Sequence, residues 1–194
     1  TVNTLKYNLG RYARQYVVPP EGVPDGAVAV KNPANLNDIV GYHHYADEAA
    51  IKKALDNAES GFQEWSERSA SERAMLLNQV ADSLERHMDE LIAICIREAG
   101  KVTQDSIDEV REAVDFCRYY AAQAEVLMDS EINLPGVTGE ANRLRYHASG
   151  PWLCISPWNF PLAIFIGQIA ANLAVGNTVI AKPAEQTPLV ALYA

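Results

Sequence analysis

The sequence contains no apolar run of the roughly 18 residues that a membrane-spanning helix needs. Its longest apolar stretch, residues 161–175, is interrupted by Gly167, Gln168 and Asn172. Basic residues are also few, because 16 Lys and Arg stand against 25 Asp and Glu, for a net charge of −9. Nucleic-acid binding depends on clustered Lys and Arg. We therefore expect neither a membrane span nor a nucleic-acid partner.

Cysteine is scarce too. Cys95, Cys117 and Cys154 lie in apolar surroundings and form no CxxC pair. Unpaired apolar thiols are typical of a reducing compartment, so we expect a cytoplasmic protein without disulfides. The four histidines lack metal-ligand spacing, and the adjacent His43 and His44 would point to opposite faces of a strand. We therefore predict no metal site.

The common glycine-rich phosphate-binding motifs, GxGxxG and GxxxxGK[ST], are also missing. A nucleotide, if bound, would have to be held by other groups. No secretory signal pattern follows Thr1, and we expect the chain to be part of a longer protein. The hydrophobic content of 48% is sufficient for a packed core.

The residues that are present divide into four segments. Residues 1–46 are rich in turns and predict a peripheral β-ribbon or arm. Residues 47–130 predict helices that pack on a common layer. Residues 131–151 contain the alternating stretch NRLRYHAS, which favours a strand. Residues 152–194 predict a truncated β-α-β-α unit with parallel strands, so the fold class is α/β.

Local signals mark the ends of the predicted helices. Asp47 is a candidate N-cap for the first. The apolar stripe of this helix has 4-3-4-3 spacing and consists of Ile51, Leu55, Ala58, Phe62 and Trp65. Ser69 and Glu72 have capping-box spacing, and the second helix is expected to continue unbroken to Gly100. The stripe of the third extends from residue 107 to residue 121.

Polar residues follow each strand of the predicted β-α-β-α unit. In an open parallel sheet, ligands bind at the carboxyl ends of the strands. SPWN, with Asn159, and KPAEQ, with Lys182 and Glu185, are expected there. Lys182 could bond a ribose hydroxyl or neutralise a phosphate, and Glu185 could accept from ribose hydroxyls. The alternative for Lys182 and Glu185 is a solvated loop with an ordinary charge pair.

Asn159 lies between Pro157 and Pro161 and has two interpretations. Asn is a favoured helix N-cap and proline is common in a first turn, so local preferences favour a cap. The functional alternative is an oxyanion donor, because a rigidly held amide N–H can stabilise charge developing on a carbonyl oxygen, by roughly 3 kcal/mol. Spacing alone leaves both interpretations open.

Two linked motifs, PWNFP at 157–161 and AVGNTVIAKPAEQTP at 174–188, resemble the aldehyde dehydrogenase superfamily. NPANLNDIVG at 32–41 and EAGK at 98–101 extend the resemblance upstream. REAVDFCRYYA at 111–121 is most similar to the 1-pyrroline-5-carboxylate (glutamate semialdehyde) dehydrogenases, as in bifunctional proline utilisation A. The resemblance implies the N-terminal part of a Rossmann-like NAD-binding domain, with a helical layer and a β-ribbon of the oligomerisation element. It also implies a homo-oligomer, with a proline dehydrogenase domain as a candidate fusion.

The resemblance further implies roles for individual residues. Asn159 would be the oxyanion amide, and Phe160 would line the aldehyde pocket. The residues beside the nicotinamide half of NAD would be Ile155, Ser156, Pro157 and Trp158. The residues at the adenosine ribose would be Lys182 and Glu185, with Pro183 and Ala184 shaping the loop.

Glu112 resembles a glutamate that lies close to the substrate in the family. The alternative is that Asp108, Glu112 and Asp115, which have helical spacing, form only a hydrated acidic face. Glu185 beside the ribose would repel a 2′-phosphate, so we predict NAD in preference to NADP.

In this family a cysteine thiolate attacks the aldehyde, hydride passes to NAD, and a glutamate-activated water hydrolyses the thioester. The family's nucleophile and base motifs come later in the sequence than Ala194, so this chain alone is expected to be inactive. Cys154 is expected to be a buried structural thiol, since no neighbouring group would lower its pKa.

The resemblance therefore predicts a fragment of a dehydrogenase that oxidises L-glutamate 5-semialdehyde to glutamate in proline catabolism. One alternative is another aldehyde dehydrogenase, for example one acting on succinate semialdehyde or betaine aldehyde. A second is a non-catalytic nucleotide-binding remnant. An α/β domain without a ligand gives no reason for an amide, a lysine and a glutamate to share one edge of a sheet.

Overall fold

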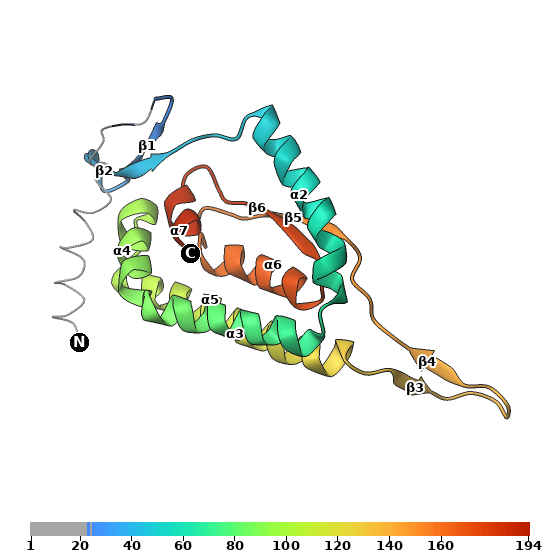
Figure 1. The fold of residues 1–194 in the computed structure, drawn as a ribbon. Helices are drawn as coiled ribbons and strands as arrows, with labels where there is room; N and C mark the ends of the chain where they lie inside the picture. Colours follow the sequence, from blue (N-terminus) through green and yellow to red (C-terminus); the bar gives the residue numbers. More distant parts are fainter. Residues whose placement is uncertain (1–22, 24) are drawn as a thin grey trace.

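The computed structural model describes residue 23 and residues 25–194. Half of the predicted arm of residues 1–46, namely residues 1–22 and 24, therefore lies outside the described residues. The elements are β1 (Val28–Asn32), β2 (Asn35–His43), α2 (Glu48–Glu67), α3 (Ala70–Arg86), α4 (Met88–Ala99), α5 (Thr103–Met128), β3 (Ile132–Leu134), β4 (Asn142–Leu144), β5 (Pro151–Ile155), α6 (Ala163–Ala174), β6 (Thr178–Lys182) and α7 (Pro188–Tyr193). Figure 1 shows their arrangement.

The first described element is the antiparallel ribbon β1–β2, in which Val28 pairs with His43. It confirms the extended structure predicted for this part of the arm. His43, the last residue of β2, is buried, and His44 directly after the strand is exposed. Arg97 of α4 attaches the ribbon to the helices, because its Nη2 lies 2.5 Å from Asp38 Oδ1 and also donates to Ile39 O.

The predicted helix starts at Asp47 and Ser69 are confirmed. Asp47 Oδ1 accepts from Ala50 N at 2.8 Å, and Ser69 and Glu72 form both bonds of a capping box. The prediction of one unbroken helix from Ser69 to Gly100 is wrong, because it breaks at His87 into α3 and α4. His87 leaves helical geometry at φ −103° and ψ 20°. Its ring Nδ1 lies 2.9 Å from Ser83 O, one turn earlier.

The prediction that all helices share one layer is also wrong, since α2 packs elsewhere. Ile51 and Leu55 on its apolar stripe are more than half exposed, and only Ala58 is buried. Instead α2 contacts β6, where Thr178 Oγ1 donates to Ala58 O at 2.7 Å. Trp65 Nε1 donates to Leu173 O at the end of α6. In Figure 1 the strands β5 and β6 lie between α2 and α6.

The main core lies where α3, α4, α5, α6 and α7 meet. The buried face of α5 consists of Ser106, Glu109, Val110, Ala113, Val114, Cys117, Ala121 and Ala124. Gly167 lets α6 approach this helix, since a Cβ there would lie 2.8 Å from Phe116 Cδ2. The close approach explains why a glycine is placed within a helix interior.

Residues 151–182 form the predicted β-α-β unit. The strands β5 and β6 are parallel neighbours, with Pro151 opposite Thr178 and Ile155 opposite Lys182. Asn177, just before β6, binds the segment just before β5, because its side-chain oxygen accepts from Ser149 N at 2.7 Å and from Gly150 N at 3.2 Å. The α/β fold class is confirmed.

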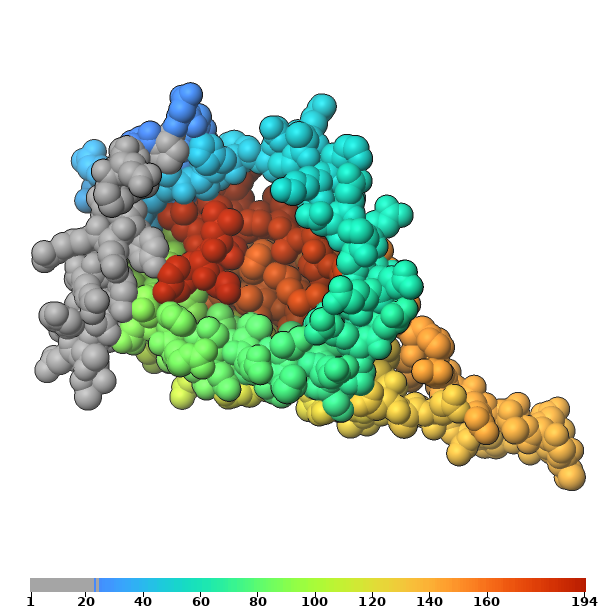
Figure 2. All heavy atoms as spheres, viewed as in Figure 1, coloured from blue at the N-terminus to red at the C-terminus, as the bar shows by residue number. Residues whose placement is uncertain are grey.

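The strand predicted from NRLRYHAS is much shorter than expected. Only Asn142–Leu144 is extended, and it pairs antiparallel with Ile132–Leu134. All residues of β3 and β4 are exposed, so no packing extends the ladder further. Figures 1 and 2 show this hairpin projecting away from the helices. Within residues 25–194, no helix has both the length and the apolar character needed to cross a bilayer.

Candidate functional site

The loops after β5 and β6 leave the sheet from the same edge. Ile155 and Lys182 end the paired strands, and Ser156 N donates to Lys182 O at 3.1 Å. The loop with Asn159 and the loop with Glu185 therefore begin side by side at the carboxyl ends of the two strands. This is the arrangement in which parallel sheets bind ligands.

Asn159 is not a helix cap, so that interpretation is wrong. The N-cap of α6 is Leu162, which makes no side-chain cap bond, and the first helical residue is Ala163. The side chain of Asn159 is exposed and makes no hydrogen bond to any described residue. Trp158 and Phe160 beside it are 58% and 41% exposed. The amide of Asn159 is thus available to a ligand at this edge.

Lys182 and Glu185 are both exposed at the same edge. Lys182 Nζ donates to Pro183 O at 3.2 Å, and Glu185 accepts from Gln186 Nε2 at 3.2 Å. Within the described residues the two side chains form no ion pair, so the charge-pair alternative lacks support. Ala184 between them is buried and anchors the loop. An ammonium and a carboxylate placed in this way suit ribose hydroxyls.

Two buried hydroxyls lie in these loops without a partner among the described residues. They are Ser156 Oγ, directly after β5, and Thr187 Oγ1, directly before α7. Both residues are more than 90% buried. Buried polar groups are ordinarily hydrogen-bonded, so unpaired ones mark positions where a further group is expected. Ser156 was predicted beside the cofactor, whereas sequence reasoning missed Thr187.

Sequence reasoning also missed two buried glutamates that bind the starts of α6 and α7. Glu109 Oε2 accepts from Leu162 N and Ala163 N, both at 3.0 Å. Glu98 accepts from Leu189 N at 2.6 Å and from Val190 N at 2.9 Å. Helical periodicity could have revealed Glu109, since it falls on the apolar stripe of α5 with Val110.

The environments of these glutamates affect their chemistry. Burial raises the pKa of Glu98 to about 7, although its two backbone hydrogen bonds act in the opposite direction. Lys101 Nζ lies 3.3 Å from Glu109 Oε1 and 4.6 Å from the centre of the Phe160 ring. Lys101 therefore connects a buried carboxylate of α5 with the loop that carries Asn159.

The predicted substrate residue Glu112 lies on the exposed face of α5, as do Asp108 and Asp115. Among the described residues, no hydrogen bond or ion pair joins Glu112 to the loops at the sheet edge. The three carboxylates thus share one exposed face of α5. A role for Glu112 in substrate binding stays a prediction.

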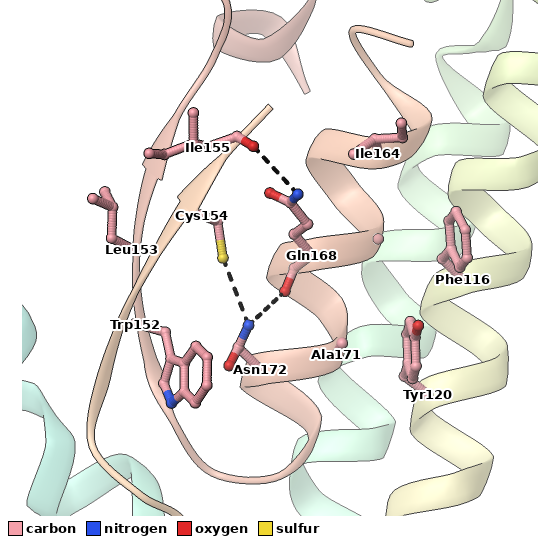
Figure 3. Close-up of a pocket in the computed structure, with 11 residues that line it drawn as sticks. Phe116, Tyr120, Trp152, Leu153, Cys154, Ile155, Ile164, Gln168, Ala171 and Asn172 are labelled. Carbon is pink, nitrogen blue, oxygen red and sulfur yellow. Dashed lines mark hydrogen bonds between the residues drawn. The ribbon is translucent and has the colours of Figure 1, made fainter. Parts of the chain in front are cut away.

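Cys154 lies beside an apolar cavity of about 430 Å³ between β5, α5 and α6, shown in Figure 3. Its Sγ accepts from Asn172 Nδ2 at 3.6 Å, while Gln168 Nε2 donates to Ile155 O. Burial raises the pKa of Cys154, so its thiolate is disfavoured. Burial likewise raises the pKa of Cys117, to about 11, and that of Cys95. These thiols are structural and poorly suited to nucleophilic attack.

The aldehyde dehydrogenase family model matches residues 21–194. The bifunctional protein PutA of Klebsiella aerogenes is 49% identical over 162 residues, which are 84% of this chain and 11% of that protein. The 1-pyrroline-5-carboxylate dehydrogenase of Anoxybacillus flavithermus is 40% identical over 82% of this chain and 31% of its own length. The chain thus spans between a tenth and a third of these relatives.

Solved structures agree with the sequence comparisons. Proline utilization A from Bdellovibrio bacteriovorus aligns with a TM-score of 0.88 and 31% identity, over 97% of this chain and 20% of that one. A 1-pyrroline-5-carboxylate dehydrogenase from Thermus, crystallised with bound NAD, aligns with a TM-score of 0.86 and 34% identity, over 97% of this chain and 38% of that one. This chain belongs to the aldehyde dehydrogenase family.

Proposed function

We propose that this chain provides the oxyanion amide and part of the cofactor site of an NAD-dependent dehydrogenase that oxidises L-glutamate 5-semialdehyde to glutamate. One observation carries the proposal: the free amide of Asn159 lies in a loop that starts beside the loop of Lys182 and Glu185. Family membership gives this arrangement its chemistry, and the similarity to 1-pyrroline-5-carboxylate dehydrogenases gives the substrate.

In this proposal, Asn159 donates its side-chain N–H to the substrate's carbonyl oxygen as negative charge develops there. Phe160 lines the aldehyde pocket, and Glu112 contacts the substrate. Lys182 and Glu185 hold the adenosine ribose of NAD, with Pro183 and Ala184 shaping their loop.

Ile155, Ser156, Pro157 and Trp158 border the nicotinamide half of the cofactor. The cofactor supplies a hydride acceptor when bound. Because the cysteines of this chain are buried with raised pKa values, the proposal assigns the nucleophile to another part of the parent protein. The parent is further proposed to be a homo-oligomer that uses the β3–β4 hairpin, and to carry a proline dehydrogenase domain.

The test is a steady-state assay of the intact gene product that contains this chain. Glutamate semialdehyde, succinate semialdehyde and betaine aldehyde are each offered with NAD and with NADP. We expect the highest kcat/KM for glutamate semialdehyde with NAD. A higher value for another aldehyde would assign a different dehydrogenase activity. NAD binding by calorimetry without turnover of any aldehyde would favour a non-catalytic nucleotide-binding protein.

A further inference from the structure

The loop that carries Asn159 is held at its end by a carboxylate from a different helix. Glu109 of α5 is 1% exposed, and its Oε2 accepts from both Leu162 N and Ala163 N at 3.0 Å. These N–H groups open α6, whose N-cap residue makes no side-chain cap bond. The first N–H groups of a helix need an outside acceptor. Glu109 therefore fixes where the loop ends and where α6 begins.

Lys101 holds the same loop one residue after Asn159. Its side chain is 13% exposed, and its Nζ lies 3.3 Å from Glu109 Oε1. Since Glu109 Oε1 makes no hydrogen bond to a described residue, this contact is an ion pair held by charge. The same Nζ lies 4.6 Å from the ring centre of Phe160, within the range of a cation–π contact.

Each of these contacts depends on the other. Glu109 neutralises Lys101, which allows the ammonium to remain among buried groups against the Phe160 ring. Lys101 in turn stabilises the carboxylate whose other oxygen binds the start of α6. The loop is thus fixed at Phe160 and at Leu162 and Ala163, whereas the Asn159 side chain itself is left without a partner.

We propose that Glu109 and Lys101 are positioning residues, which hold the Asn159 amide where it can stabilise the oxyanion. This inference rests on the proposed function, in which Asn159 acts on the aldehyde. An oxyanion donor must be oriented before the charge develops, since a displacement of about 1 Å can cost on the order of a hundredfold in rate. Loosening the loop should therefore lower kcat.

The test compares Glu109→Gln, Lys101→Met and Lys101→Arg in the intact gene product. Asp115→Asn is the control, because it removes an exposed carboxylate from the same helix. We expect Glu109→Gln and Lys101→Met to lower kcat by about tenfold with little change in the KM for NAD. Lys101→Arg keeps the positive charge and should recover most of the rate. Asp115→Asn should behave as wild type.

A second measurement separates positioning from a general structural role. If Glu109 acts through Asn159, then Glu109→Gln should lower kcat less than about twofold in an Asn159→Ala background. An equal loss in both backgrounds would overturn the inference.

Hydrogen exchange of the Leu162 and Ala163 amides gives a readout that needs no activity. We expect faster exchange in Glu109→Gln and Lys101→Met, and unchanged exchange in Asp115→Asn. Unchanged exchange in the first two variants would overturn the inference. A wild-type protein without aldehyde dehydrogenase activity would instead count against the proposed function, and the exchange data would still decide whether Glu109 and Lys101 hold the loop.

Discussion

The two helices that follow the site loops, α6 and α7, begin in the same way but in different electrostatic settings. Each start is bound by a buried glutamate from another helix, Glu109 for α6 and Glu98 for α7. Glu109 has the Lys101 ammonium at 3.3 Å. Among the described residues no cation forms an ion pair with Glu98.

At a buried helix start without a counter-ion, burial has the largest influence on the carboxyl group. For Glu98, desolvation outweighs two backbone hydrogen bonds, and the pKa of this carboxyl rises to about 7. The loop before α7, which carries Glu185, is therefore attached through a group that titrates near neutral pH. The loop before α6, which carries Asn159, is attached through an ion pair. We expect the α6 side to govern kcat and the α7 side to govern cofactor binding and the pH dependence of stability.

The largest expected effect comes from removing the amide on the α6 side. Asn159→Ala should lower kcat by about a hundred- to a thousandfold, because it deletes the proposed donor to the developing oxyanion. The KM for NAD should change little, since the proposed ribose contacts belong to the α7 side. Steady-state kinetics of the intact gene product with glutamate semialdehyde measure both values.

Asn57→Ala on the exposed side of α2 is the control and should leave both constants unchanged. A rise in the KM for NAD with kcat preserved would mean that Asn159 contacts the cofactor instead. The proposed division of labour between the two loops would then be wrong.

The next expected effect concerns the pH dependence of the free energy of unfolding, to which Glu98 contributes. The folded protein binds the Glu98 proton more tightly than the unfolded chain, since the pKa rises from 4.5 to about 7. The contribution of this group to stability is therefore full below pH 4.5 and is lost as the pH rises to about 7. The loss amounts to about 3 kcal/mol. Glu98→Gln should remove this part of the pH dependence.

Urea unfolding of wild type and Glu98→Gln between about pH 5 and pH 8 measures the difference. The slope of the unfolding free energy against pH is the quantity to compare. The Glu98→Gln variant also loses one of the two carboxylate acceptors, so it is expected to be less stable than wild type at every pH. Glu125→Gln, at an exposed position of α5, should keep the wild-type slope. Parallel curves for wild type and Glu98→Gln would show that Glu98 does not titrate in this range.

Features governed by local rules could be predicted from the sequence. Asp47, Ser69 and Gly100 mark helix ends through bonds to neighbouring backbone or through a positive φ, and all three act as predicted. The order of apolar segments along the chain also predicted the parallel pair β5–β6. Because the two strands are parallel, the topology alone places Asn159 and Lys182 at the same edge of the sheet.

Features that depend on contacts between distant residues were missed. The carboxylate of Glu109 and the amide of Leu162 are 53 positions apart, and no local pattern indicates that they meet. Local preferences favoured a cap at Asn159 over the oxyanion interpretation for the same reason, since the actual acceptor at the start of α6 comes from α5. The placement of α2 against β6 likewise depends on the tertiary bond from Thr178 to Ala58, whereas its stripe alone suggested the main core.

The smallest expected effect tests the cofactor side directly. Glu185→Gln should raise the KM for NAD by about tenfold, because a neutral amide is a weaker acceptor for ribose hydroxyls than a carboxylate. It should also narrow the preference for NAD over NADP, since the repulsion of a 2′-phosphate is removed. The kcat with saturating NAD should stay near wild type, in contrast to Asn159→Ala.

Glu59→Gln on α2 is the control, because it removes an exposed carboxylate elsewhere, and it should change neither the KM for NAD nor kcat. A fall in kcat for Glu185→Gln at saturating NAD would show that the two loops act together, and the comparison between α6 and α7 would lose its functional meaning.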